Sequence, residues 1–200
     1  MRILAIADVE VAELRDAFAP ELFADIDLIL SCGDLSPEYL TRVREIINAP
    51  LYYILGNHDL RYRQSPPVGC TYIGFSACRH EHLKLLGLSG SRWYNGGIYQ
   101  YHETEMRFII WKLYLALWKQ RGTDIIITHA PPRHIHDAED RCHRGFRCFH
   151  TLLNRYQPAY FLHGHIHAQF GTRQERKTCI GNTAIINCCG SYVFEINTDQ

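Results

Sequence analysis

The sequence predicts an α/β domain, and three observations support this fold class. Apolar runs rich in β-branched residues end in polar clusters, as strands buried on both faces do; they cover residues 2–8, 26–34, 50–57, 123–130 and 159–165. Segments with helical periodicity lie between these runs. After residue 167 the chain changes to short β segments separated by the turn signals Gly181-Asn182 and Gly190-Ser191.

Length and composition set further limits. The 200 residues, of which 46% are hydrophobic, are enough for one core, so we expect a single domain over residues 1–200. Lys plus Arg total 21 and Asp plus Glu total 21, so no bulk charge attracts a nucleic acid polymer. The apolar start stops at Asp8, and no stretch approaches the length of a membrane span. The eight scattered cysteines indicate free thiols, and we expect a cytoplasmic protein with no membrane partner.

Three helices are expected between the strands. Ser36 and Pro37 form an N-cap and first-turn pair at the start of the first helix. The longest helix covers residues 103–122, where Gly122 supplies the stop. Another helical pattern covers residues 146–156 and ends before Pro158.

The predicted helix over residues 103–122 has a broad apolar face. Met106, Leu113 and Leu117 define a stripe at helical spacing, and Trp111 and Trp118 widen it. A dimer contact or a substrate wall is one interpretation of this face. Because large apolar helix faces are usually core, we favour the other interpretation, a helix wedged between a sheet and a further layer.

Polar side chains follow five of the predicted strands, at the point where each strand ends. They are Asp8 with Glu10, Asp34, Asn57 with His58 and Asp59, His129, and His165 with His167. Because α/β folds bind ligands at the carboxyl ends of their strands, we expect these side chains to meet at one edge. Each cluster alone has a structural explanation, such as a capped turn or a solvated histidine, but the set indicates a functional site.

The side-chain types at these strand ends predict a two-metal centre. Carboxylate and amide oxygens together with imidazole nitrogens suit Mn²⁺, Fe or Zn²⁺, and one carboxylate between two ions can bridge them. Two such ions clamp a phosphoryl group and lower the pKa of a bridging water molecule, which becomes a hydroxide nucleophile near neutral pH. The predicted reaction is therefore the hydrolysis of phosphoesters.

The order of these motifs resembles the calcineurin-like metallophosphoesterase superfamily, in particular its small single-domain bacterial and archaeal members. The matching motifs are Asp8 with the residue two positions later, Gly33-Asp34, Gly56-Asn57-His58-Asp59, His129 and Gly164-His165-x-His167. They span most of the chain, and the tail of short β segments is similar as well. The resemblance implies a two-sheet β-sandwich flanked by helices, with a dinuclear metal site at one edge.

The resemblance also implies roles for single residues, with Asp34 bridging the two metal ions. The ligands of the first metal are then Asp8, Asp34 and His167, and those of the second are Asp34, Asn57, His129 and His165. His58 is not a ligand in this scheme: it stabilises charge on the phosphoryl oxygens or protonates the leaving group, and Asp59 orients it. Gly56 gives the backbone room to turn these side chains inward.

One position departs from the family pattern, because Glu10 stands where the family usually has a histidine. Residues two apart in an extended segment face the same way, so Glu10 can occupy the place of that histidine. As a ligand, or as an acceptor for a metal-bound water, it makes the first site more anionic and favours Mn²⁺ or Fe²⁺ over Zn²⁺. The alternative is that Glu10 turns away and the first site is weakened or empty.

Two loops carry further candidates. In residues 86–97, a strand followed by a glycine-rich loop, Arg92 is a candidate for a phosphate contact, and a solvated arginine is the alternative. The irregular stretch over residues 129–146 resembles a loop that contributes to the substrate pocket in small family members. It carries His134, His136, Asp140 and His143, to which we assign no role.

The functional prediction is a metal-dependent phosphohydrolase, with phosphodiesters favoured over phosphomonoesters. The alternative is a binding scaffold that keeps the fold without catalysis, as the retromer subunit of this superfamily does, although the retention of His58 argues against it. The length and the neutral charge disfavour a repair nuclease. The physiological substrate and the oligomeric state, a homo-oligomer included, stay open.

Overall fold

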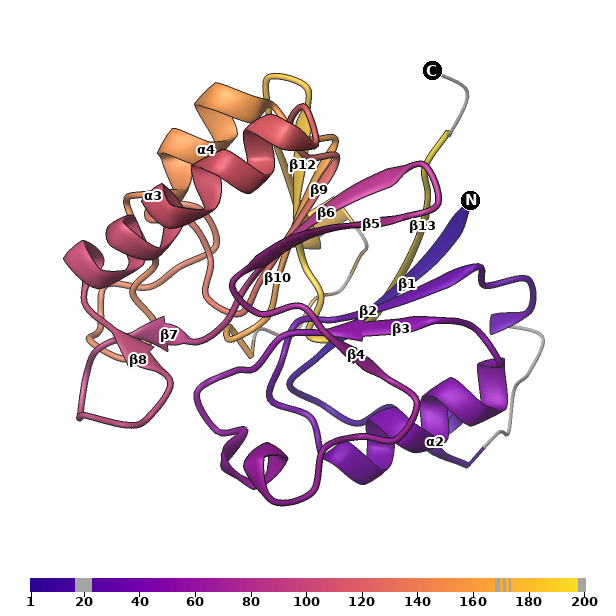
Figure 1. The fold of residues 1–200 in the computed structure, drawn as a ribbon. Coiled ribbons are helices and arrows are strands. Elements are labelled where there is room, and N and C mark those ends of the chain that lie inside the picture. Colours follow the sequence, from indigo (N-terminus) through magenta and orange to yellow (C-terminus); the bar gives the residue numbers. More distant parts are fainter. Residues whose placement is uncertain (17–22, 168–169, 171, 173, 198–200) are drawn as a thin grey trace.

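The computed structural model describes residues 1–16, 23–167, 170, 172 and 174–197. Two sheets lie face to face in it, and helices cover the outer face of each (Figure 1). This arrangement confirms the predicted fold class, a two-sheet sandwich flanked by helices.

The first sheet is mainly parallel. Its strands, in spatial order, are β13 (Gly190–Glu195), β1 (Arg2–Ala7), β2 (Leu28–Ser31), β3 (Leu51–Tyr53) and β4 (Thr71–Tyr72). The strands from β1 to β4 run parallel, whereas β13 pairs antiparallel with β1, with Arg2 opposite Glu195. The last strand of the chain therefore lies beside the first.

The second sheet has four parallel inner strands and two antiparallel edge strands. In spatial order they are β11 (Lys177–Ile180), β12 (Thr183–Asn187), β10 (Tyr160–His163), β9 (Ile125–Thr128), β6 (Leu83–Leu88) and β5 (Ser76–His80). β11 pairs antiparallel with β12, and β5 with β6. A separate pair, β7 (Ser91–Arg92) and β8 (Gln100–Tyr101), follows β6.

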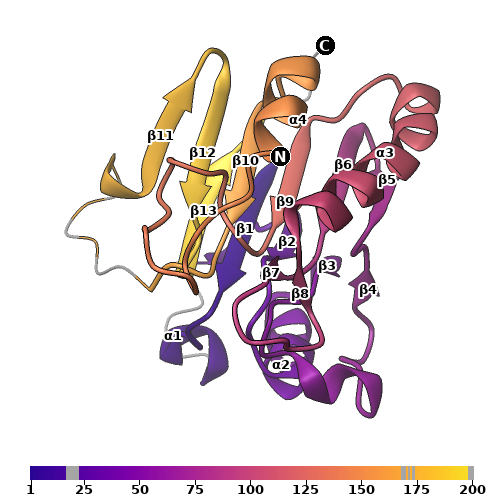
Figure 2. The ribbon, with the colours of Figure 1, turned by 90° about the vertical axis from the view of Figure 1, so that its left-hand side faces the viewer.

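Helices complete the layers on both sides (Figure 2). α1 (Ala12–Arg15) and α2 (Pro37–Ile47) cover the first sheet, and α3 (Glu103–Lys119) and α4 (Phe149–Tyr156) cover the second. Two short 3₁₀ helices, η2 (Leu60–Arg63) and η3 (Gln174–Arg176), lie in the connections. Apolar side chains fill three interfaces: one between the two sheets and one between each sheet and its helices.

The local signals explain most of these elements. Each predicted inner strand lies within its apolar run, because a strand covered on both faces has no polar side. At the start of α2, the Ser36 hydroxyl accepts a hydrogen bond from the backbone N–H of Tyr39, and Asn48 ends the helix in a left-handed conformation. All eight cysteines are unpaired thiols, as expected. None of the described helices is long and apolar enough to cross a membrane.

The packing of α3 differs from the prediction. Met106, Ile110 and Leu117 are buried against the second sheet, but Trp111 and Trp118 are 62% and 75% exposed. The helix is therefore not wedged between two layers, and its outer face is uncovered in the described part of the chain. The prediction was wrong because helical periodicity gives the residues that share a face, not whether a further layer covers it.

Candidate metal centre

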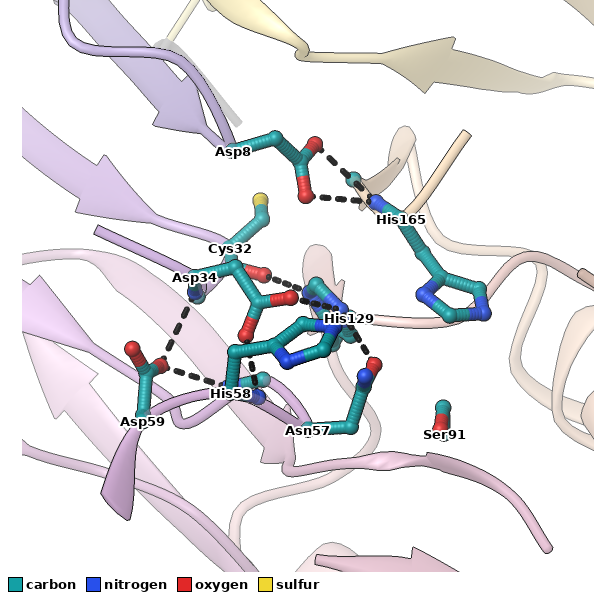
Figure 3. Close-up of polar contacts among 12 residues, drawn as sticks. Asp8, Cys32, Asp34, Asn57, His58, Asp59, Ser91, His129 and His165 are labelled. Atoms are coloured by element: carbon teal, nitrogen blue, oxygen red, sulfur yellow. Dashed lines mark hydrogen bonds and ion pairs between the residues drawn. The ribbon is translucent and has the colours of Figure 1, made fainter. Parts of the chain in front are cut away.

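The predicted polar clusters meet at one edge of the sandwich, where β1, β2, β3, β9 and β10 end (Figure 3). Asp8, Asp34 and His129 each offer one ligand atom, and these atoms all lie within 4.8 Å of one another. The side chains of Asp8 and His129 are fully buried, and that of Asp34 is 8% exposed. Two carboxylates and an imidazole therefore lie close together and are shielded from solvent.

Three of the candidate ligands have an unusual backbone conformation. The φ angles of Asp8, Asp34 and His165 are 63°, 57° and 69°, in the left-handed region that residues with a side chain adopt infrequently. Each of these residues stands shortly after a strand end, where the left-handed turn directs the side chain across the edge. Backbone strain of this kind is concentrated at functional sites.

Two glycines make the close approach of the strands possible. A Cβ atom on Gly56 would lie 2.1 Å from Asp34 Oδ1 and 2.8 Å from the Cε1 atom of His129. A Cβ atom on Gly164 would lie 2.6 Å from Asp8 Oδ2. Both glycines are therefore required by the space that the candidate ligands occupy, which agrees with the role predicted for Gly56.

The contacts of His129 test whether a cation fits here. Its Nδ1 atom lies 2.9 Å from the backbone carbonyl of Cys32, and a carbonyl can only accept, so Nδ1 carries the proton. Its Nε2 atom lies 3.1 Å from Asp34 Oδ2 and 3.1 Å from Asn57 Oδ1. In the neutral ring Nε2 is an acceptor as well, so three acceptor atoms converge. Such an arrangement requires a positive charge among them, either a proton or a metal ion.

The pKa values of the pair show what a proton does in that place. Burial alone opposes the charge of His129, but the Asp34 carboxylate outweighs it and raises the pKa of His129 to about 9. Burial likewise opposes the charge of Asp34, but His129 lowers the pKa of Asp34 to about 2. In the metal-free protein the two groups therefore form an ion pair over a wide pH range, in which the histidinium supplies the cation that the oxygens require.

His165 is arranged as a neutral ligand. Its backbone N–H donates to both carboxylate oxygens of Asp8, at 2.9 and 3.0 Å. Its Nε2 atom donates to the carbonyl of Cys142 at 2.7 Å, which leaves the lone pair of Nδ1 for a metal. Burial, together with the positive charge of His129, lowers the pKa of His165 to about 3, so the ring is neutral at physiological pH.

The two outer candidates of the first site lie differently. His167 Nε2 is 3.6 Å from Asp8 Oδ1, and its side chain is 62% exposed. Glu10 is exposed, and its carboxylate accepts a hydrogen bond from the hydroxyl of Ser36, the N-cap of α2. Glu10 is thus not brought into the group formed by Asp8, Asp34 and His129. Whether Glu10 binds a metal or a metal-bound water stays a prediction.

His58 and Asp59, in the motif after β3, make different contacts with Asp34. The backbone N–H of His58 donates to Asp34 Oδ1 at 2.8 Å, and the residue itself is exposed at the rim. The buried carboxylate of Asp59 accepts from the backbone N–H groups of Asp34 and Gly56, at 2.9 and 2.7 Å. These bonds fix the backbone under Asp34, and the resemblance-based role of Asp59 in orienting the His58 ring stays a prediction. Burial, together with the charge of Asp34, raises the pKa of Asp59 to about 6.

The sequence analysis missed Tyr94 in the loop between β7 and β8. The amide nitrogen of Asn57 donates to the Tyr94 hydroxyl at 3.2 Å, which turns the amide oxygen toward His129. Gln100 fixes this loop, because its side-chain oxygen accepts the backbone N–H groups of residues 94, 95 and 96. The signal was present, since this glycine-rich loop was expected to approach the site. Arg92 lies on β7, and its guanidinium makes no hydrogen bond with any described residue.

His136 anchors the stretch over residues 129–146. His136 Nδ1 lies 2.9 Å from Nε2 of the buried His163, and His136 Nε2 lies 2.8 Å from the Thr178 hydroxyl. His136 therefore ties the stretch to β10 and β11. The remaining candidates of this stretch, exposed or partly exposed, are His134, Asp140 and His143.

A family model matches most of the sequence. Residues 1–169 match the family model of the calcineurin-like phosphoesterases. No curated protein matches the chain in sequence.

Solved structures share the fold at low sequence identity. The TT1561 protein of Thermus thermophilus has 13% identity and a TM-score of 0.65, with 94% of this chain and 89% of that chain covered. The phosphopantetheinyl hydrolase of Mycobacterium tuberculosis has 11% identity and a TM-score of 0.50, with 94% and 88% covered. Vps29 of Entamoeba histolytica, complexed with zinc, has 12% identity and a TM-score of 0.50, with 100% and 88% covered. Since the family model spans most of the sequence, as the order of the motifs predicted, the chain belongs to the calcineurin-like phosphoesterase family.

Proposed function

We propose that the protein is a metal-dependent phosphoesterase that uses two divalent metal ions and favours phosphodiesters over phosphomonoesters. The convergence of His129 Nε2, Asp34 Oδ2 and Asn57 Oδ1 carries this proposal, because three acceptors at this spacing require a cation. Membership of the calcineurin-like phosphoesterases supports the reaction class. A first site that includes the Glu10 carboxylate would favour Mn or Fe over Zn.

The residues proposed to hold the two ions are those that the family resemblance implies. Those of the first site are Asp8, Asp34 and His167, with Glu10, and those of the second are Asp34, Asn57, His129 and His165. When bound, such ions supply Lewis acids for the phosphoryl oxygens and acidify the attacking water. Asp34 belongs to both sites, so its position is the most constrained, and Asp59 holds its backbone.

His58 is the proposed proton donor. Its backbone N–H is fixed on Asp34 Oδ1 at 2.8 Å, which keeps the exposed imidazole beside the shared carboxylate. From the rim, the ring can give a proton to the leaving oxygen of a bound phosphoester. Arg92, on the neighbouring loop, is proposed as a further contact for the phosphate.

Replacing His58 with alanine is expected to lower kcat by about 10²- to 10⁴-fold, the usual contribution of a positioned general acid. The two metals should remain bound, because His58 is not among the proposed ligands. The measurement is the hydrolysis of paired chromogenic phosphate mono- and diesters by metal-stripped protein reloaded separately with Mn²⁺, Fe²⁺ and Zn²⁺.

The matched control for this variant is His82→Ala, at an exposed histidine between β5 and β6, at the opposite end of the sheets. It should leave the rate unchanged with every metal. Full activity of the His58 variant, or turnover by the protein without metal, would rule out the proposed roles.

Replacing Glu10 with glutamine is expected to weaken metal binding at the first site by about tenfold. To act as a ligand, Glu10 must leave the hydroxyl of Ser36, so Ser36→Ala should not weaken the same site. Metal content is measured by mass spectrometry after equilibrium dialysis, with Glu13→Gln in α1 as the control. An Asp8→Asn/Glu10→Gln double variant that keeps two metals would show that neither carboxylate is needed.

A binding scaffold without catalysis is the second candidate function. The contact between Glu10 and Ser36 favours it, because it holds a carboxylate away from the first site. Metal binding alone does not separate the two functions, since the Vps29 structure is itself named as a zinc complex. Two bound metals combined with no turnover of either ester class would support the scaffold.

A further inference from the structure

The outer face of α3 carries four exposed apolar side chains that the proposed function does not use. Phe108, Trp111, Leu115 and Trp118 are 53%, 62%, 60% and 75% exposed. Their spacing of three, four and three residues places them in one line along the helix, on the side away from Met106 and the second sheet. We call these four residues the outer stripe of α3. A contiguous apolar surface of this kind marks an interaction site.

The side chains at the start of the outer stripe pack against one another. The rings of Phe108 and Trp111 stack with their centroids 5.7 Å apart and their planes 16° apart. The ammonium group of Lys112 lies 4.5 Å from the centre of the Phe108 ring. These contacts hold the aromatic rings in place before any partner binds, which lowers the entropy cost of binding.

Basic side chains flank the outer stripe on both sides. Arg107 lies on one side of it and Lys112 and Lys119 lie on the other, all of them exposed. The two acidic residues of the first turn are engaged with backbone N–H groups: Glu103 accepts those of Arg147 and Cys148, and Glu105 accepts that of His102. Three cations therefore flank the stripe directly, whereas the two carboxylates lie at the start of the helix and are hydrogen-bonded there.

The flanking cations favour an anionic partner. Arg107 on one flank and Lys112 and Lys119 on the other can all pair with an anionic surface that covers the stripe. Aromatic rings and leucine between lysines and arginines are the composition of surfaces that lie in the headgroup region of anionic membranes.

We propose that the outer stripe of α3 is a membrane-binding surface that inserts into the headgroup region of bilayers containing anionic phospholipid. The surface continues toward the candidate metal centre, since the exposed ring of Trp93 stacks on His102 at the start of α3, with centroids 5.2 Å apart. The next residue, Tyr94, contacts Asn57. The pair of strands that carries this loop lies beside the first turn of α3 (Figure 1).

The test is flotation of the full chain with vesicles of phosphatidylcholine alone and of phosphatidylcholine mixed with phosphatidylglycerol. We expect at least about tenfold more protein bound to the anionic vesicles, with the difference reduced by salt. The Trp93→Phe variant leaves Trp111 and Trp118 as the only tryptophans of the three in the chain, so its emission should shift to the blue on binding.

Two double variants and two controls assign the effect to the outer stripe. Trp111→Ala/Trp118→Ala and Lys112→Glu/Lys119→Glu should each lose at least about tenfold in binding, and because these side chains are exposed the fold should be unaffected. The control Val68→Ala changes a 72% exposed apolar side chain on the other face of the protein and should bind normally. Asp34→Asn should also bind normally, which separates the stripe from headgroup binding at the metal centre.

Three results would overturn the proposal. The first is equal binding to neutral and anionic vesicles, and the second is normal binding by the double tryptophan variant. The third is a wild-type dimer in sedimentation velocity that becomes a monomer in that variant while vesicle binding is absent, since a second copy would then cover the stripe.

Discussion

The Asp34→Asn variant is expected to lose about 10³-fold or more in kcat/KM, since even residues that only support a metal ligand contribute about 10- to 100-fold. Asp34 is the carboxylate proposed to belong to both metal sites, and its Oδ2 atom lies 3.1 Å from His129 Nε2. Asparagine has the same shape but no charge, so the loss should come from weaker metal binding rather than from misfolding. Steady-state kinetics together with metal analysis of the purified variant measures both.

The same substitution should change how the stability of the metal-free protein depends on pH. Because the folded-state pKa of His129 is raised from 6.5 to about 9, its contribution is fully present below pH 6.5 and is lost as the pH rises through about 9. Without the Asp34 charge that loss should be largely absent. Urea unfolding of both chelated proteins between these pH values measures the difference.

Asp16→Asn is the control for both measurements, because Asp16 pairs only with the exposed Arg15 among the described residues. It should keep the wild-type rate and metal content. A full rate in Asp34→Asn would show that the cation site around His129 is not the catalytic centre.

The Gly56→Ala variant should lose both stability and metal, although the substitution adds a single methyl group. The new Cβ atom would lie 2.1 Å from Asp34 Oδ1 and 2.5 Å from its Cγ atom, so the carboxylate has to leave its place beside His129. Overpacking of this kind typically costs about 1–3 kcal/mol of unfolding free energy. Denaturant unfolding and metal analysis should show the two losses together.

Gly181→Ala is the matched control for the loss of metal. Gly181 has a φ of +55°, and nothing lies within 4 Å of its added Cβ atom. The variant should lose about 1–2 kcal/mol from the left-handed backbone alone and keep its metals. If Gly56→Ala also retained two metals at normal affinity, Asp34 would not be held where the proposal needs it.

The sequence predicted the buried strands and the edge of the site because both depend on signals that are local, whereas the two-sheet layering came from the family resemblance. A strand buried on both faces is continuously apolar, and the five predicted strands that carry the site were recognised in this way. The carboxyl ends of such strands lie at the same edge, whatever the conformation of the loops that follow them. Asp8, Asp34 and His129 were therefore predicted as neighbours from their positions after strands.

Contacts that depend on a partner far away in the sequence were not predictable. β13 leaves the terminal hairpin and pairs with β1, at the other end of the chain. Tyr94 reaches Asn57 across 37 positions, and the carboxylate of Asp59 accepts a hydrogen bond from the backbone of Asp34 across 25 positions. Side-chain rotation and the meeting of distant segments decide these contacts, and neither leaves a periodic pattern in the sequence.

The candidate ligands do not come from one layer of the sandwich. Asp8, Asp34 and Asn57 follow strands of the first sheet, whereas His129 and His165 follow strands of the second. The two proposed metal ions would therefore join the two sheets, through ligands as far apart in the sequence as Asp8 and His165, which are separated by 157 positions. A ligand that binds only the folded state stabilises it by mass action. The free energy of unfolding should therefore rise with the concentration of free metal. A chelator would then lower the free energy of unfolding, because it removes the ions that join the two sheets.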